Sequence, residues 1–293
     1  MKLASYLLDG TTHWGAVTEH GIAPLDRYWP TLAHGLAAGV PALRSRLALV
    51  TERVNSAQTQ WLAPIEPATR ILCVGINYGL HVKEMGRQMP TWPSVFVRLV
   101  DSFVGHEAPV LCPFVSAEFD YEAELAVVIG RSGRHVPEAS ALDYVSGYTC
   151  LSDNSVRDFQ KHNAQVTPGK NFSRSGAIGP WITTADEIAD PQQLEVIARV
   201  NGAVMQHGCT ADMIFPVARI ISYISTFTTL RPGDIIATGT PDGVGAGRTP
   251  PVWLRAGDVL EIDIPGIGVL RNPVANEPHP SQADADDGSP HPQ

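Results

Sequence analysis

Two carboxylates stand two residues apart in an otherwise apolar segment near the middle of the chain. Glu122 and Glu124 lie within residues 119–130, where residues 125–129 are apolar and Gly130 ends the run, a pattern that predicts a β-strand. Side chains alternate along a strand, so both carboxylates are expected on one face. A hard divalent cation would relieve their repulsion, but so would solvent at a sheet edge, and the pair alone favours neither.

A third carboxylate, Asp153, follows the next predicted strand, residues 145–151. If this strand pairs with the acidic one, Asp153 reaches the same end of the sheet. Three carboxylates with positions left for water or substrate suit Mg²⁺, Mn²⁺ or Ca²⁺ and are too hard for a typical Zn²⁺ site. The alternative is that Asp153 caps a short helix over residues 154–161, which by itself is the commoner arrangement.

His81 and Glu84 stand three residues apart on a short helix predicted over residues 78–85, which Asn77 can cap and Gly86 can end. Residues at this spacing share a face of the helix. A carboxylate beside an imidazole fixes its tautomer and raises its basicity, as a general base requires. For an isolated pair of this kind, a surface ion pair is the commoner explanation.

Lysine is scarce, with four residues against seventeen arginines, so Lys170 stands out in the uncharged stretch 167–172. It could stabilise a developing oxyanion, although a solvated loop lysine would look the same. Thr240 lies in a turn over residues 238–241 that ends a predicted strand. Its hydroxyl and the free backbone N–H groups could bind a carboxylate, or the segment could be a plain turn.

The elements that must position these groups follow from apolar periodicity and turn residues. Residues 1–26 predict a small β meander, and residues 31–60 predict mainly helix, split in two by Gly39 and Pro41. A proline-containing linker covers 62–69. Beyond it, the sequence predicts a helix over 211–226, a long glycine-rich loop over 163–179 and strands over 71–75, 94–100, 181–183, 194–200, 203–206, 234–238, 259–264 and 268–272.

Three regions are expected from this pattern. Residues 1–63 form a small N-terminal domain, and residues 64–275 form a larger domain that carries all the candidate site residues. Residues 276–293 contain four prolines, three aspartates and almost no apolar side chain, which predicts a disordered tail.

Composition excludes several classes of partner. The 293-residue chain has a net charge of −9 and no basic stripe, so nucleic acid is not an expected partner. No apolar run approaches membrane-spanning length, and the first ten residues are broken too soon for a signal peptide. The four cysteines lack metal-type spacing and are typical of buried thiols in a reducing compartment. The sequence therefore predicts a cytoplasmic protein.

A glycine-rich run at residues 243–247 follows a predicted strand. A dinucleotide fingerprint would need a helix to begin there, but Pro250 and Pro251 stand at that point, so this function is excluded. The stretch from Asp153 also lacks the glycine and the closing glutamate of an EF-hand loop.

Taken together, five motifs that occur in order over residues 70–274 resemble the fumarylacetoacetate hydrolase (FAH) family, and this resemblance favours a functional site over the alternatives above. The motifs are Gly75-x-Asn77-Tyr78-x-x-His81-x-x-Glu84, Asp120-Tyr121-Glu122-x-Glu124-Leu125, Gly147-Tyr148-Thr149 with Asp153 and Arg157-Asp158, Gly169-Lys170-x-Phe172, and Thr238-Gly239-Thr240-Pro241. The resemblance implies an α+β, mostly β fold, namely the FAH-type mixed β-sandwich roll with a small N-terminal α/β domain, assembled as a homodimer.

The resemblance also implies a role for each matching residue. Metal ligands are Glu122, Glu124 and Asp153, which would hold Mg²⁺ or else Mn²⁺ or Ca²⁺. The water-activating dyad is His81 and Glu84, on a lid. Groups that contact the substrate are Lys170 and Gln160 at the oxyanion, Thr240 at a carboxylate, and Tyr78 and Arg98 in the binding site. Relatives often carry lysine where this chain has Arg98, and an apolar residue at Asn154, so the two departures affect the choice of substrate.

The implied activity is metal-dependent hydrolysis of a C–C bond in a small-molecule 2,4-dioxo acid of the acylpyruvate type. The alternative is isomerisation or decarboxylation of a related oxo-dicarboxylate, such as a 2-hydroxymuconate derivative in aromatic catabolism or oxaloacetate. A metal-dependent 2-oxo acid binding protein without turnover is the non-enzymatic alternative.

Overall fold

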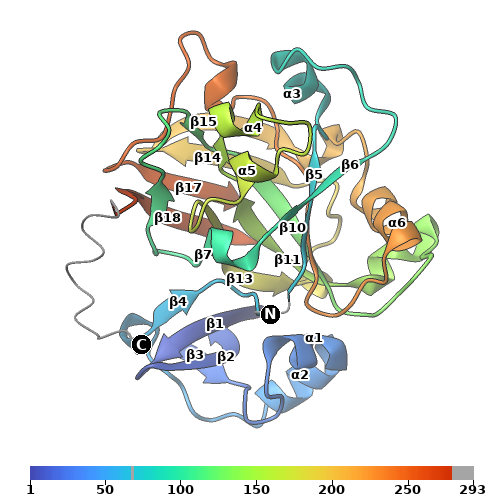
Figure 1. Cartoon of the computed structure of the whole chain (residues 1–293). Coiled ribbons are helices and arrows are strands. Elements are labelled where there is room, and N and C mark those ends of the chain that lie inside the picture. Colours follow the sequence, from blue (N-terminus) through green and yellow to red (C-terminus); the bar gives the residue numbers. More distant parts are fainter. Residues whose placement is uncertain (67–68, 279–293) are drawn as a thin grey trace, which may run out of the picture.

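The computed structural model describes residues 1–66 and 69–278 (Figure 1). Its strands are β1 Lys2–Leu8, β2 Thr11–Thr18, β3 Gly21–Pro24, β4 Gln60–Leu62, β5 Ile71–Gly75, β6 Ser94–Arg98, β7 Phe103–Val104, β8 Val110–Cys112, β9 Phe119–Asp120, β10 Ala123–Ile129, β11 Val145–Ser152, β12 Ser155–Val156, β13 Gly176–Thr184, β14 Glu195–Val200, β15 Ala203–Cys209, β16 Ile235–Ala237, β17 Val259–Ile264 and β18 Gly268–Asn276. Its α-helices are α1 Leu32–Ala38, α2 Val40–Leu47, α3 Gly79–Glu84, α4 Arg157–Gln160, α5 Thr167–Lys170 and α6 Val217–Phe227.

Two large sheets dominate the described part of the chain. The first has eleven strands in the order β3-β2-β1-β13-β11-β10-β16-β5-β6, with β4 added beside β1 and β7 beside β13. The second has five strands in the order β15-β14-β17-β18-β8. Because strands outnumber short helices throughout, the predicted α+β, mostly β class is confirmed. No helix within the described ranges is long and apolar enough to cross a membrane.

Strand β10 is apolar from Leu125 to Ile129 because both of its faces are buried. Leu125, Val127 and Ile129 enter the core against the five-stranded sheet, whereas Ala126 and Val128 enter a second core shared with the N-terminal helices. This alternation is the strand period of two, and burial on both faces explains the continuous apolar run.

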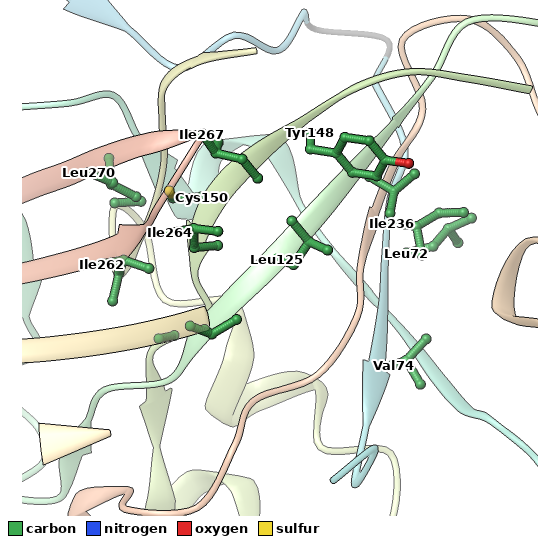
Figure 2. Close-up of a cluster of buried hydrophobic side chains, with 14 of the residues drawn as sticks. Leu72, Val74, Leu125, Tyr148, Cys150, Ile236, Ile262, Ile264, Ile267 and Leu270 are labelled. Carbon is green, nitrogen blue, oxygen red and sulfur yellow. The ribbon is translucent and has the colours of Figure 1, made fainter. Parts of the chain in front are cut away.

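The core between the two sheets is formed by side chains of their facing strands. Figure 2 shows Cys150, from β11, among Ile264 and Leu270 of β17 and β18, with Leu125 of β10 beside them in the same core. Two sheets that bury their inner faces in this way form a sandwich.

The N-terminal meander is continuous with the large sheet. Strand β1 pairs with β13 through Lys2 opposite Thr183 and Leu3 opposite Ile182. The predicted N-terminal domain, residues 1–63, is therefore joined to the larger domain by backbone hydrogen bonds between β1 and β13. The sequence correctly predicts the break between α1 and α2 at Gly39, whose φ is +84°.

Asn77 has a different role from the predicted helix cap. Tyr78 is the N-cap of α3 and makes no side-chain cap hydrogen bond. The buried Asn77 amide instead donates to the carbonyls of Phe215 (3.1 Å) and Thr238 (2.8 Å), and its Oδ1 accepts from the Phe215 N–H at 2.8 Å. It thereby ties the start of α3 to the segments before α6 and after β16. Gly86 ends the helix with φ +61°, as predicted.

Two predicted helices are longer than the observed ones. The helix predicted over 211–226 begins at Val217, because Pro216 stands at its N-cap and disfavours helical backbone in the residue before it. The helical region predicted over 31–60 ends with α2 at Leu47, and β4 (Gln60–Leu62) spans its last residue and the first residue of the predicted linker.

Other differences concern segments too short to show a period. The predicted loop over 163–179 contains α5 and the start of β13, and the predicted strand over 94–100 ends at Arg98. Strands β7 and β8 are not predicted by the sequence at all. Strand β18 includes Asn276, which the sequence assigns to the tail, and residues 279–293 of that tail lie outside the described residues.

Candidate active site

The predicted acidic strand is two short strands with a corner between them. β9 ends at Asp120, β10 begins at Ala123, and β12 pairs with β9 while β11 pairs with β10. At this corner the Asp153 N–H donates to the Glu122 carbonyl at 2.9 Å. The prediction that Asp153 reaches the acidic pair is therefore confirmed. Asp153 caps no helix, because α4 begins only at Arg157.

The three carboxylates converge in the interior. Glu122, Glu124 and Asp153 each offer an oxygen within 4.8 Å of the other two, and each residue is at most 5% exposed. Their oxygens form a hard donor set of the kind that Mg²⁺, Mn²⁺ and Ca²⁺ prefer.

Lys170 lies between two of these carboxylates. Its Nζ donates to Glu122 Oε2 at 2.7 Å and to Asp153 Oδ2 at 2.6 Å. Burial lowers the pKa of Lys170, but the charges of Asp153 and Glu122 outweigh it and the pKa lies above its usual value. The lysine is the last residue of α5 and is buried, so the alternative of a solvated loop lysine is wrong.

The charge of Glu124 is the least compensated of the three. Burial raises the pKa of Glu122, but Lys170 and Arg157 lower it to about 2. Burial, Asp153 and Glu122 all raise the pKa of Glu124 well above its usual value, and its hydrogen bond from the Gly239 N–H (2.8 Å) offsets little of this. A divalent cation bound between the three carboxylates would supply the missing charge, so these residues fit a metal site.

Arg157 is a site residue to which the sequence assigns no role, although it stands in one of the five motifs. Its guanidinium forms ion pairs with Asp120 (2.8 Å) and Glu122 (2.7 Å), and it donates to Gln160 Oε1 at 3.0 Å. Arg157 therefore fixes the orientation of Glu122 and of Gln160, which the sequence predicts to contact the substrate.

Arg98 does not line the site where the sequence predicts substrate binding. It is fully buried behind Asp153, donating to Asp153 Oδ1 at 2.8 Å and to Ser175 Oγ at 2.9 Å, with its guanidinium 4.2 Å from the Phe103 ring centre. Because Arg98 occupies Oδ1, Oδ2 is left to face Lys170. Arg98 therefore positions Asp153 and does not contact the cavity.

His81 and Glu84 make the contact that their spacing predicts. His81 Nδ1 lies 3.1 Å from Glu84 Oε2, and Glu84 Oε1 accepts the Gly243 N–H at 2.9 Å. His81 is 6% exposed. An Nδ1–H that donates to Glu84 leaves Nε2 as the basic nitrogen.

A single cavity of about 120 Å³ brings most of the predicted site residues together. Its lining includes Glu122, Glu124, Asp153, His81, Lys170, Gln160 and Thr240. Thr240 Oγ1 also accepts a hydrogen bond from Gln206, which the sequence does not single out (2.8 Å). Tyr78 lies outside the cavity, and its buried hydroxyl has no hydrogen-bond partner among the described residues.

The elements that carry these groups meet around the cavity. Figure 1 shows α3 and α4 in the half of the molecule away from the N-terminal meander, with α5 beside α4. Residues of α3, α4 and α5 line the cavity together with residues at the ends of β5 and β11.

Comparison with known proteins agrees with the motifs. Residues 70–275 match the family model described as fumarylacetoacetate (FAA) hydrolase C-terminal. A mitochondrial oxaloacetate tautomerase of Rattus norvegicus is 38% identical over 262 residues, which cover 87% of this chain and 84% of that protein. The cytoplasmic location expected for this chain stays a prediction.

Two solved structures share the architecture. Fumarylacetoacetate hydrolase from Exiguobacterium antarcticum aligns with a TM-score of 0.80 at 34% identity, covering 94% of this chain and 100% of that chain. Maleylpyruvate hydrolase from Sphingobium sp. SYK-6, solved with manganese(II) and pyruvate, aligns with a TM-score of 0.78 at 29% identity, covering 95% and 100%. The chain therefore belongs to the fumarylacetoacetate hydrolase family, and it has the fold that its motifs predict.

Proposed function

We propose that this protein isomerises a small 2-oxo dicarboxylic acid of the oxaloacetate type, by moving a proton between carbon 3 and the oxygen on carbon 2. The observation that carries the proposal is that His81, oriented by Glu84, and the charged Lys170 line the same small cavity. The relative described as an oxaloacetate tautomerase supports this alternative better than hydrolysis of an acylpyruvate, which is the main prediction from the sequence.

The proton steps follow from the positions of the side chains. His81 Nε2 takes the proton from carbon 3 while Glu84 stabilises the resulting imidazolium through Nδ1. Lys170 faces the same cavity and stabilises the negative charge that develops on the carbon 2 oxygen. The protonated His81 Nε2 then gives its proton to that oxygen, which forms the enol and restores the neutral imidazole. A divalent cation held by Glu122, Glu124 and Asp153, for which we propose Mg²⁺ with Mn²⁺ or Ca²⁺ as alternatives, would polarise the 2-oxo group.

The size of the cavity supports a small substrate. Its volume of about 120 Å³ is below the roughly 300–1,000 Å³ of pockets that hold drug-sized ligands. A four-carbon acid suits this space better than an acylpyruvate with a long acyl group.

The proposal also includes the homodimer that the family resemblance implies.

Arg87 is expected to bind the second carboxylate. Three cationic arginine or lysine side chains line the cavity, and Arg157 and Lys170 are already paired with acidic residues. Arg87 forms no ion pair with any described residue, so a carboxylate of the substrate can pair with it. Replacing it with glutamine (Arg87→Gln) should raise the KM for oxaloacetate about tenfold, since a hydrogen bond to a charged group contributes about 1.5 kcal/mol or more.

The matched control is Lys83→Gln, which removes an exposed charge on α3 that does not line the cavity. Binding of oxalate, which has no distal carboxylate, should be unchanged in both variants. Equal KM changes in the two variants would show that Arg87 acts only through overall charge.

The function itself is tested by three assays on the purified wild-type protein with Mg²⁺. Interconversion of enol and keto oxaloacetate is followed by ultraviolet absorbance, decarboxylation by pyruvate formation from oxaloacetate, and hydrolysis by pyruvate release from an acylpyruvate. We expect metal-dependent interconversion to be the fastest reaction. Faster acylpyruvate cleavage would establish hydrolysis instead, and tight binding without turnover would establish a binding protein.

A further inference from the structure

The glycine-rich run at residues 243–247 contacts two separate parts of the candidate site. On one side, its backbone N–H groups hold Asp120: Oδ1 accepts from Gly245 at 2.7 Å and Oδ2 accepts from Ala246 at 3.0 Å. On the other side, the Gly243 N–H donates to Glu84 Oε1 at 2.9 Å. A run that the sequence excludes as a nucleotide-binding loop therefore binds two carboxylates of the protein itself.

Both carboxylates lead onward to residues that line the cavity. The second oxygen of Glu84 faces His81 Nδ1 at 3.1 Å. Asp120 forms an ion pair with Arg157 at 2.8 Å, and Arg157 forms another with Glu122 at 2.7 Å. The run thus stands in the middle of a continuous series of polar contacts between the base and a metal-ligand candidate.

The glycines are needed for these approaches. A Cβ at Gly245 would overlap the Val252 carbonyl and lie 2.6 Å from Asp120 Oδ1, and a Cβ at Gly247 would overlap the Glu84 carboxyl group. Gly243 has φ +97°, a conformation that L side chains rarely adopt. Each alternate residue of the run therefore has its own steric reason to be glycine.

Helix α3 depends on this contact for its orientation. It has only six residues, and Asn77 fastens its start through the Phe215 and Thr238 carbonyls. Its last residue, Glu84, is held by the Gly243 N–H. A six-residue helix is too short to be stable by itself, so these contacts decide where His81 lies.

We propose that residues 243–247 are a positioning element that sets Glu84, and through it His81, relative to Glu122 and the other metal-ligand candidates. The inference rests on the proposed function only in taking His81 as the base. None of these five residues is a catalytic residue, because they act through the Glu84 and Asp120 carboxylates.

Gly247→Ala is the most informative variant. Gly247 does not require a positive φ, and the added methyl group meets a flexible side chain, so Glu84 is displaced while the turn can still form. At Gly245, by contrast, the methyl group meets backbone, and folding itself would suffer. We expect Gly247→Ala to lower kcat about tenfold with little change in KM.

A double-mutant cycle separates positioning from general structural damage. In a Glu84→Ala background the clash is gone, so adding Gly247→Ala should cost less than about twofold. The control is Gly79→Ala, in the helix α3 that also carries Glu84. The added methyl group lies 3.9 Å from its nearest neighbour, so kcat should stay within about twofold of the wild-type value. An equal loss from Gly247→Ala in both backgrounds would overturn the proposal.

A second readout requires no substrate. Nitrogen NMR of labelled histidine reports the His81 tautomer, which Gly247→Ala should shift toward the state seen in Glu84→Ala. An unchanged signal would overturn the proposal even if activity fell, whereas a shifted signal in a protein without tautomerase activity would contradict the proposed function alone. Should Gly247→Ala fail to fold, Asp120→Asn, which weakens the other side of the run, must shift the same signal for the proposal to stand.

Discussion

Replacing Glu124 with glutamine (Glu124→Gln) is expected to abolish metal-dependent turnover while making the metal-free protein more stable. Burial and the nearby charges of Asp153 and Glu122 raise the pKa of Glu124, so its ionised form opposes folding at neutral pH. Each pKa unit by which the native value exceeds the unfolded one costs about 1.4 kcal/mol. Glutamine removes this cost and still accepts from the Gly239 N–H, but it lacks the charge that a divalent ion requires.

The sign of the pH dependence gives an independent check. Because the folded pKa of Glu124 is raised, the metal-free wild type should lose stability as the pH rises from the unfolded value of about 4.5 through the folded pKa. Glu124→Gln should lack this loss.

Two measurements test the Glu124 prediction. Calorimetric titration with Mg²⁺ should show affinity reduced by at least about 100-fold, more than is typical for loss of a residue behind a ligand. Thermal unfolding with EDTA should show a higher midpoint than the wild type. The control is Glu19→Gln, which replaces an exposed carboxylate in the N-terminal meander. It should change neither the Mg²⁺ affinity nor the unfolding midpoint. A variant that is less stable without metal, or that keeps its Mg²⁺ affinity, would contradict this account of the triad.

Removing the imidazole in His81→Ala should slow interconversion of oxaloacetate tautomers by about 100- to 10,000-fold, the usual contribution of a positioned general base. His81 is the only histidine that lines the cavity described here, and Glu84 orients its Nδ1. Binding of Mg²⁺ and oxalate should persist, because the acidic triad and Lys170 remain. His20→Ala, in an exposed turn, is the matched control and should keep full activity.

The same variant distinguishes the candidate reactions. A loss confined to proton exchange in oxaloacetate supports the proposed isomerase. If His81→Ala instead abolishes acylpyruvate cleavage but spares oxaloacetate decarboxylation, hydrolysis is the main activity and His81 serves to activate water. Turnover of every substrate at the wild-type rate would remove His81 from the mechanism.

The sequence by itself predicts that Glu122 lies near Glu124 and His81 near Glu84, because these proximities depend on local spacing, and the resemblance to the family assigns the residues their roles. His81 and Glu84 are three residues apart in α3, so the period of a helix is enough to place them together. Glu122 and Glu124 are only two residues apart, although Glu122 lies at the corner before β10 rather than within a strand. Placing Asp153 beside these two carboxylates requires only one further assumption, that β10 pairs with the neighbouring strand β11. Most element types follow from the same local patterns, whereas the FAH-type fold is implied only by the resemblance of the five ordered motifs to that family.

Only the tertiary structure shows which groups lie behind the site. Arg98 lies 55 residues from the carboxylate it holds, Asn77 lies 161 residues from the carbonyl of Thr238, and Gly245 lies 125 residues from Asp120. No periodicity connects residues so far apart. Arg98 therefore looks like a substrate-binding residue in the sequence and is found behind a metal-ligand candidate in the fold.

The glycine-rich run at residues 243–247 shows the same difference between what local sequence predicts and what long-range packing decides. From its sequence the run is only excluded as a dinucleotide fingerprint, because Pro250 and Pro251 stand where the helix would begin. The folded chain decides that the bound groups are Asp120 and Glu84, because it brings the segment beyond β16 against both β9 and α3. Backbone N–H groups in a turn are available to any nearby acceptor, and only long-range packing determines which carboxylates come within reach.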